Sequence, residues 1–244
     1  MSPLREARVL VVGVGGLGSP AAAVLAQAGV GQLRLLDDDR VDESNLHRQV
    51  LFETSDVGQP KALRAAERLL ALAREAGHRH TRVEAIEQRL LPEDAIARVG
   101  GHDLVVEGAD NFATKFLAAD AAALARVPIV QGGIVRWTGW ALAWAPGAGP
   151  CLRCLFEDIP RDRVETCAAA GVVGPACGLL GAAMGALALR WLSGDASVAG
   201  TRLSLDAWAG RLRVGRPRRR VDCALCAGRI ARIDSTRYAA GCAG

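Results

Sequence analysis

Short apolar runs and longer segments with helical periodicity alternate along the first half of the chain. The run at residues 8–12 predicts a buried strand, the glycines at 13–18 a turn, and the Ala-rich stretch at 19–28 a helix. The same reasoning predicts further strands at 32–36, 81–86 and 103–107, and further helices at 61–75, 92–99 and 114–126. Strands that alternate with helices predict an α/β fold with a parallel, doubly wound sheet.

The pattern changes after Pro128. Residues 128–131 and 139–144 look like strands with no helix between them, so the sheet should continue there with antiparallel members. The segment 151–167 is rich in charge and lacks periodicity, which favours an exposed crossing loop. Two short strands are expected near the C-terminus, around Asp206 and at 211–214.

One segment, from Cys167 to Leu189, contains no charged residue and is long enough to cross a bilayer. Its Ala and Gly content makes it only weakly hydrophobic, and glycines spaced four apart, at 174/178 and 181/185, suit close helix packing. We therefore expect a buried or dimer-interface helix, and no membrane span. The predicted organisation is one domain, with a nucleotide-binding half (1–145) and a second half (146–244) made of crossover loop, apolar helix and tail.

Composition excludes some functional classes. Half of the 244 residues are apolar and the net charge is only +4, with acidic and basic residues mixed, so a nucleic-acid binder is not indicated. The N-terminus has no signal-peptide pattern, which favours a cytoplasmic protein. Seven cysteines in such a protein are expected to be metal ligands or reactive thiols rather than disulfides.

The segment VLVVGVGGLG predicts a phosphate-binding loop. It places Gly13, Gly15, Gly16 and Gly18 between a strand and a helix, where the missing side chains let a ligand approach the helix N-terminus, as in Rossmann-type folds. Asp37 ends the next strand, where a carboxylate can reach ribose hydroxyls. These features indicate a nucleotide, and alone they would favour a dinucleotide oxidoreductase.

The stretch after Asp37 shifts the prediction towards a triphosphate. Arg48 and Lys61 could neutralise the β- and γ-phosphates, and Asn45 could donate to a phosphate oxygen. A dehydrogenase has no use for such a cluster. Taken singly, each of these residues would more often be a solvated surface group.

Four motifs together, GxGGLGS, LLDxDxVxxSNLxRQ, DVGQPKA and GADN, resemble the ubiquitin-activating enzyme superfamily, and within it the adenylyltransferases of molybdopterin-synthase and thiamine pathways. The resemblance extends from about Arg8 to Cys226. It implies ATP contacts at Gly13, Gly15, Gly16, Gly18, Asp37, Ser44, Asn45, Leu46, His47, Arg48, Lys61, Asp110 and Asn111. It also implies catalytic roles for Arg48, Lys61 and Asp110, with Asp110 suited to hold Mg²⁺. His47 is expected to be a neighbour of the nucleotide rather than a base.

Two CxxC pairs, Cys151/Cys154 and Cys223/Cys226, predict a closed four-thiolate site for structural Zn²⁺. Such a site would staple the C-terminal tail to the loop after Trp144. The resembled family carries the same arrangement. The alternative is a set of buried thiols without metal.

Cys167 is the candidate reactive thiol, because thiamine-pathway members of the resembled family carry at the matching position a cysteine that links covalently to the carrier. Other members adenylate without it, so a purely structural role stays open. Cys177 is expected to be a small core residue, and no role is assigned to Cys242.

The resemblance implies an enzyme that uses MgATP to adenylylate the C-terminal carboxylate of a small ubiquitin-like sulfur carrier ending in Gly-Gly, and a homodimer. Family members usually begin with a helical segment that contains an arginine, and this arginine contacts the ATP bound to the neighbouring subunit. Neither Arg5 nor Arg8 matches that arginine. The alternatives are a NAD-dependent oxidoreductase, a non-catalytic partner subunit, and a relative that activates a small-molecule, peptide or RNA-linked carboxylate.

Overall fold

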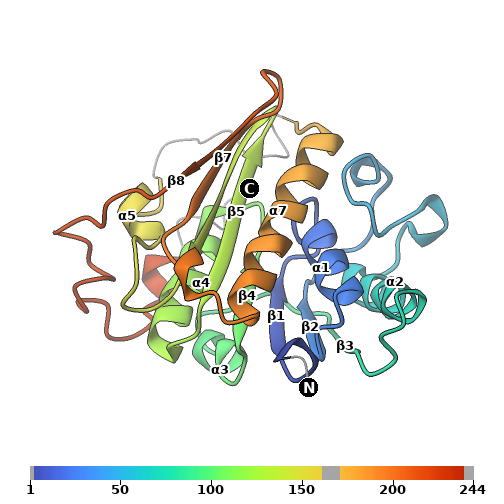
Figure 1. Cartoon of the computed structure of the whole chain (residues 1–244), viewed down its shortest axis with the longest axis horizontal. Coiled ribbons are helices and arrows are strands. Elements are labelled where there is room, and N and C mark those ends of the chain that lie inside the picture. The colour runs from blue at the N-terminus through green and yellow to red at the C-terminus, as the bar shows by residue number, and fades with distance from the viewer. Residues whose placement is uncertain (1–2, 161–170, 239–244) are drawn as a thin grey trace.

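The fold, taken from a computed structural model that describes residues 3–160 and 171–238, is a single mixed sheet covered by helices on both faces (Figure 1). The strands are β1 Arg8–Val12, β2 Gln32–Leu36, β3 Arg82–Ile86, β4 Leu104–Glu107, β5 Ile129–Val135, β6 Thr138–Trp144, β7 Arg202–Asp206 and β8 Arg211–Gly215. The α-helices are α1 Gly18–Gln27, α2 Lys61–Glu75, α3 Ala95–Val99, α4 Phe112–Ala125, α5 Leu152–Phe156 and α7 Gly174–Leu192. Short 3-10 helices lie at Pro3–Arg5, Glu43–Asn45, Thr54–Asp56, Ala196–Val198 and Ser235–Arg237.

The parallel part of the sheet fixes where a site can form. Within the described residues the strand order is β3-β2-β1-β4-β5-β6-β7-β8, and the first five strands run parallel. Val12 lies opposite Leu36 on β2 and opposite Glu107 on β4. Strands β2, β1 and β4 therefore end at the same level, and the loops that follow them meet at one edge of the sheet. Open α/β sheets bind their ligands at this edge.

The antiparallel extension confirms the predicted change of pattern after Pro128. β5 turns directly into β6, and β7 and β8 follow, each antiparallel to its neighbour. The edge strand β8 is exposed along its whole length. The predicted fold class, a mainly parallel Rossmann-like sheet with antiparallel C-terminal strands, is confirmed.

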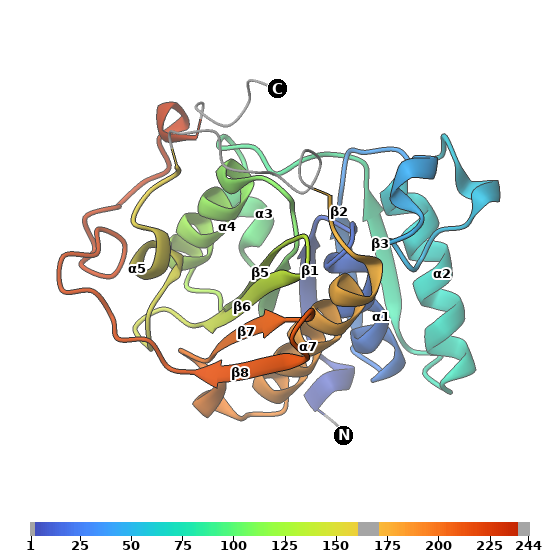
Figure 2. The same cartoon turned by 90° about the horizontal axis from the view of Figure 1, so that it is seen from above.

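Two helical layers bury the two faces of the sheet. Figure 2, seen from above, shows α1, α2 and α7 on one face and α3 and α4 on the other. Strand β1 contributes to the core on each face of the sheet. Val9 and Val11 belong to the core under α1, α2 and α7, and Leu10 and Val12 to the core under α3 and α4. This explains why the strand reads as a continuous apolar run.

Helix α7 contains the uncharged segment that the sequence predicts to be helical, with Arg190 in its last turn, and its glycines explain its composition. A Cβ on Gly181 would lie 2.3 Å from Cγ of Pro20 on α1, and one on Gly185 would lie 2.8 Å from Cβ of Val24. α7 is long and apolar enough to cross a membrane, with a mean hydropathy of 1.3 over its best window, but half of that window is buried inside the fold. Its predicted role as a buried helix is confirmed.

The prediction of an exposed loop at 151–167 is wrong at its start. Residues Leu152–Phe156 form the short helix α5, and Cys151, Leu152 and Arg153 are buried. The charges of this segment misled the prediction, because the guanidinium of Arg153 is itself buried in an ion pair.

Candidate active site and metal centre

The glycine loop after β1 folds back tightly on itself. The backbone of Gly13 is left-handed, with φ of +80°, and its amide donates to the Leu36 carbonyl over 2.9 Å. A Cβ on Gly18 would lie 1.8 Å from the Gly13 carbonyl oxygen, so no larger residue fits there. The loop therefore presents backbone at the start of α1, as a phosphate site requires.

Asp37 ends β2 and holds the glycine loop. One carboxylate oxygen accepts the Val14 amide over 2.8 Å, and the other accepts the Asp39 amide over 2.9 Å. Burial raises the pKa of Asp37, and these two amide donors oppose the rise. Each oxygen keeps a lone pair that could accept a ribose hydroxyl, so the predicted nucleotide role is compatible with this second, structural one.

Asn45 and Arg48 lie together in the segment after β2. The side chain of Asp42 caps the 3-10 helix Glu43–Asn45 by accepting the Ser44 amide. The Arg48 guanidinium donates to the Ser44 carbonyl over 3.0 Å and to the Asn45 side-chain oxygen. Both side chains remain partly exposed, so they are preorganised next to each other and still open to a ligand.

Two neighbouring residues of this segment have packing roles. Leu46 packs against the core shared by α1 and α7. His47 is exposed, and its Nε2 lies 3.3 Å from the Val172 carbonyl. The carbonyl of His47 is also where a Cβ on Gly174 would collide, at 2.0 Å. The 45–48 segment is thereby fixed against the start of α7.

Lys61 begins α2 and is buried. Its Nζ lies 2.8 Å from Oδ2 of Asp39, and its amide donates to the Asp39 carbonyl over 2.9 Å. The segments around Val41 and Gly58 are joined by antiparallel backbone hydrogen bonds, which return the chain to the end of β2. Only 6% of the Lys61 side chain is exposed, against 63% of that of Asp39, so the ammonium is buried and its carboxylate partner faces solvent.

Asp110 lies in the turn after β4, beside the glycine loop. The Gly108 amide donates to the Val12 carbonyl over 2.9 Å, and a Cβ on Gly108 would lie 2.8 Å from the Gly18 amide nitrogen. Asp110 is exposed. Asn111 caps α4, because its side-chain oxygen accepts the Thr114 amide over 2.8 Å. The predicted contacts at the ends of β1, β2 and β4 are thus brought to one edge of the sheet.

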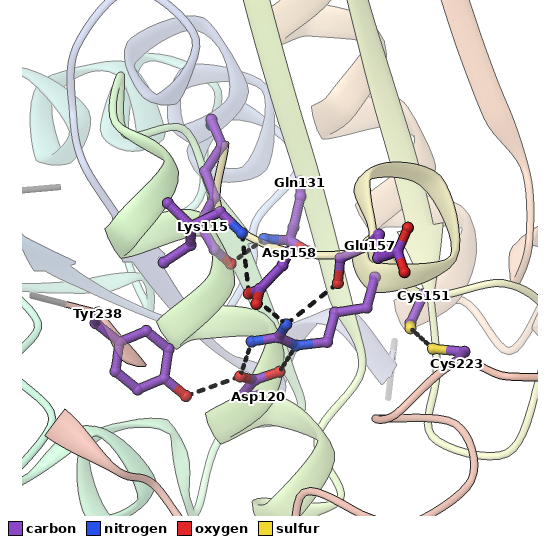
Figure 3. Close-up of polar contacts among 10 residues, drawn as sticks. Lys115, Asp120, Gln131, Cys151, Glu157, Asp158, Cys223 and Tyr238 are labelled. Atoms are coloured by element: carbon purple, nitrogen blue, oxygen red, sulfur yellow. Dashed lines mark hydrogen bonds and ion pairs between the residues drawn. The ribbon is translucent and has the colours of Figure 1, made fainter. Parts of the chain in front are cut away.

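The four predicted metal-ligating cysteines converge. Cys151, Cys154, Cys223 and Cys226 place their sulfur atoms within 4.8 Å of one another, with contacts of 3.4 Å between Cys151 and Cys223 and 3.6 Å between Cys154 and Cys226. Figure 3 shows Cys151 and Cys223 facing each other. A tetrahedral Zn–S length of about 2.3 Å would separate the sulfurs by about 3.8 Å, so the set fits zinc and is too open for disulfides.

Sequence reasoning missed the residues that attach this cysteine cluster to α4. The Arg153 guanidinium donates to both carboxylate oxygens of Asp120, over 2.9 and 2.8 Å, and the Tyr238 hydroxyl donates to the same carboxylate over 2.7 Å (Figure 3). Asp120 is fully buried. The available signal was a single acid inside the apolar helix sequence FLAADAAALA, which predicts a buried partner.

A second buried polar cluster, also missed, lies at the end of β4. Glu107 has no exposed surface, and it contacts Lys115 on α4 and Gln131 on β5. Burial raises the pKa of Glu107, and the Lys115 ammonium and three hydrogen-bond donors oppose the rise.

The remaining cysteines differ in what the structure says of them. Cys177 is buried, and its sulfur lies 3.2 Å from where a Cβ on Gly16 would be, which confirms it as a core residue beneath the glycine loop. Cys167 and Cys242 lie outside the described residues.

Comparison with known proteins adds relatives over nearly the whole length. Residues 1–225 match the ThiF family. The chain is 41% identical to a sulfur carrier protein adenylyltransferase of Thermus thermophilus, over 98% of this chain and 89% of that protein. It is 40% identical to the bovine adenylyltransferase and sulfurtransferase MOCS3, over 98% of this chain but only 52% of that protein. The chain thus spans about half the length of that two-activity relative.

Among solved structures, the crystal structure of E. coli MccB with ATP resembles the fold. The TM-score is 0.78 and the sequence identity 22%, and the match covers 92% of this chain and 68% of MccB. At this identity the likeness supports the fold alone.

Proposed function

The chain belongs to the ThiF family, and from that premise we propose that it adenylylates the C-terminal carboxylate of a small ubiquitin-like sulfur-carrier protein. ATP is the second substrate, and pyrophosphate and the acyl adenylate are the products. The named relatives that match most of this chain are adenylyltransferases of this kind. The sulfurtransferase activity in the name of the longer relative is not part of the proposal.

The observation that carries the proposal is the edge where β1, β2 and β4 end. The glycine loop, Asp37 and the Asn45–Arg48 pair follow strands that end at this edge, and Lys61, at the start of α2, is held there by its contact with Asp39. Such an edge supplies a nucleotide-binding loop and two cations for a polyphosphate. A nicotinamide-dependent oxidoreductase would leave both cations without a purpose.

The reaction needs orientation and charge neutralisation more than proton transfer. The attacking carboxylate is already an anion, so no general base is required when it displaces pyrophosphate at the α-phosphate. Arg48 and Lys61 would stabilise the negative charge that develops on pyrophosphate. Asp110, exposed beside the glycine loop, would hold Mg²⁺, which neutralises phosphate charge when bound.

We assign Zn²⁺ a structural role at the four cysteines. The donor set is closed, with four thiols and no position for a substrate, which is the pattern of a structural site. The proposal also includes a cytoplasmic homodimer. The homodimer is supported by exposed apolar residues of β8, of the turn before it and of α7: Trp208 is 78% exposed, Val214 70% and Leu179 52%. The mass of the chain alone in solution tests whether a second copy covers this surface.

The deciding experiment is ATP–pyrophosphate exchange with candidate carriers that end in Gly-Gly. We expect exchange that depends on the carrier and disappears when its last two residues are removed. The matched control is the same carrier with an amidated C-terminus, which has no attacking carboxylate. Binding of NAD in place of ATP, together with no exchange for any carrier, would contradict the proposal.

A further inference from the structure

The charged cluster at the end of β4 has no part in the mechanism above. Glu107 has no exposed surface, Gln131 is 1% exposed and Lys115 is 4% exposed. Buried ion pairs contribute little net stability on average, because desolvation of the two charges offsets their attraction. A contribution to stability is therefore not a sufficient explanation for this pair beside the site.

The cluster joins three elements. Lys115 Nζ lies 3.2 and 3.3 Å from the two carboxylate oxygens of Glu107 and also donates to the Gly132 carbonyl. Gln131 donates to Glu107 over 3.2 Å and to the Lys115 carbonyl over 2.9 Å. Figure 3 shows Lys115 and Gln131 side by side. Helix α4, strand β4 and strand β5 are thereby held at one point.

The same carboxylate reaches the turn that carries Asp110. Oε1 of Glu107 accepts the amide of Ala109 over 2.7 Å, and Ala109 directly precedes Asp110. On the other side of Asp110, the Asn111 side chain caps α4. Asp110 is therefore an exposed carboxylate in a turn that is fixed on both sides, by Glu107 before it and by the helix cap after it.

This turn also forms one wall of the glycine loop. A Cβ on Gly13 would lie 3.0 Å from the Ala109 amide nitrogen, and one on Gly108 would lie 2.8 Å from the Gly18 amide nitrogen. The two backbones pack so closely that no side chain fits between them, and the Gly108 amide donates to the Val12 carbonyl over 2.9 Å. A displacement of the Ala109 amide would shift Asp110 and the phosphate-binding backbone together.

We propose that Glu107 and Lys115 are positioning residues: their buried ion pair fixes the Ala109 amide and so sets the place of Asp110 relative to the bound MgATP. The inference rests on the proposed function. It assigns neither residue a contact with the substrate. Its consequence is that the pair controls the affinity for MgATP and the Mg²⁺ requirement more than it controls folding.

The test separates affinity from stability with two variants. Lys115→Met leaves a buried carboxylate without its cation, and we expect a lower midpoint of thermal unfolding and a KM for MgATP raised about tenfold, the scale seen when residues behind a metal ligand are altered. The double variant Glu107→Gln/Lys115→Met removes both charges and should recover much of the midpoint. It should keep the raised KM, because the ion pair that fixes the side chain at 107, and with it the Ala109 amide, is absent.

Asp120→Asn is the matched control, because it weakens the other buried ion pair of the same helix. We expect it to lower the midpoint and leave the KM for MgATP unchanged. Two outcomes would overturn the inference: a raised KM in Asp120→Asn, or a double variant in which KM and the unfolding midpoint both recover. Either would mean that KM follows the general stability of the protein. If Lys115→Met does not fold, the milder Gln131→Leu should raise the KM for MgATP by a smaller factor. An unchanged KM in that variant would count equally against the inference.

Calorimetric titration of each variant with MgATP repeats the test without the carrier. Parent protein that binds MgATP but shows no exchange would count against the proposed reaction alone. Equal MgATP affinity in parent and in the double variant would count against the positioning role alone.

Discussion

Helix α4 carries two buried ion pairs that serve different regions of the molecule. Near its start, Lys115 pairs with Glu107 and supports the turn beside the glycine loop. Five residues later, Asp120 pairs with Arg153 and accepts a hydrogen bond from the Tyr238 hydroxyl, and so attaches the cysteine cluster. Glu107 and Lys115 are 8 residues apart in the sequence, whereas Asp120 is 33 residues from Arg153 and 118 from Tyr238.

The two regions also differ in how exposed their polar groups are. At the nucleotide edge Asn45 and Arg48 are partly exposed and Asp110 is exposed. In the cysteine cluster three of the four thiols are buried, and Arg153 has its donors engaged by Asp120, Asp158 and the Glu157 carbonyl. An open set of charges suits a ligand that binds and leaves, whereas a closed set suits a permanent structural role.

The largest effect is expected from the cysteine cluster. Purified protein should hold about one zinc per chain, and Cys223→Ser should lose it and unfold at a much lower temperature, because zinc binding to thiolate sites contributes roughly 10–16 kcal/mol in small peptides. Metal analysis and thermal unfolding measure this. Cys177→Ser is the matched control, since that thiol lies outside the cluster, and it should retain the metal. Folded, active protein without zinc would remove the claim.

A smaller effect is expected from Asp120→Asn, which breaks the attachment and leaves the ligands intact. Loss of one partner of a buried pair costs about 3–5 kcal/mol of unfolding free energy, measured here by urea denaturation. Asp158→Asn is the control, because the side chain of Asp158, which contacts the same guanidinium, is 59% exposed. Its cost should stay below about 1 kcal/mol. Equal costs for the two variants would mean that burial does not distinguish the two contacts.

At the nucleotide edge the effect should fall on rate. Lys61→Ala and Arg48→Ala should each lower adenylate formation about a hundredfold, which corresponds to about 2.7 kcal/mol of transition-state stabilisation, with zinc content unchanged. The measurement is pyrophosphate exchange. Arg68→Ala is the control, since Arg68 also belongs to α2 but pairs with Glu53 away from the edge, and it should keep the parent rate. Near-normal exchange in both test variants would contradict the assignment.

The sequence predicts the first region better than the second, for a physical reason. The glycine loop and Lys61 belong to local patterns, since the loop follows a strand and Lys61 opens the helix expected at 61–75, which the structure has at Lys61–Glu75. The CxxC pairs were recognisable because spacing alone defines them. The partners of Asp120 were not, because Arg153 and Tyr238 meet it only after the sheet has formed.

Burial of charge was the other limit. Glu107 and Lys115 look like surface residues in a sequence that is 23% charged. Their roles depend on the level at which β4 ends beside β1 and on the packing of α4 over it, and neither can be read from residue spacing. Helix α5 was missed for the same reason, since its charged arginine favoured a loop.

The smallest effect on adenylation is expected from Cys167→Ser, because attack on ATP uses the carrier's own carboxylate and only a later covalent transfer would need a thiolate. We propose that Cys167, which lies outside the described residues, serves that second step alone. Its neighbours in sequence, Arg161 and Arg163, would favour the thiolate if they fold close to it. The variant should therefore exchange pyrophosphate near the parent level. It should lose a reducible carrier adduct, an acyl disulfide formed when a persulfide on Cys167, loaded by a sulfane-sulfur donor, displaces AMP from the acyl adenylate; intact mass with carrier, ATP and that donor present measures it. Cys242→Ser is the control and should keep the adduct.

An adduct that survives Cys167→Ser would move the role to Cys242, since Cys177 is only 1% exposed. Loss of pyrophosphate exchange itself in Cys167→Ser would show that the segment around residue 167 helps to build the nucleotide edge.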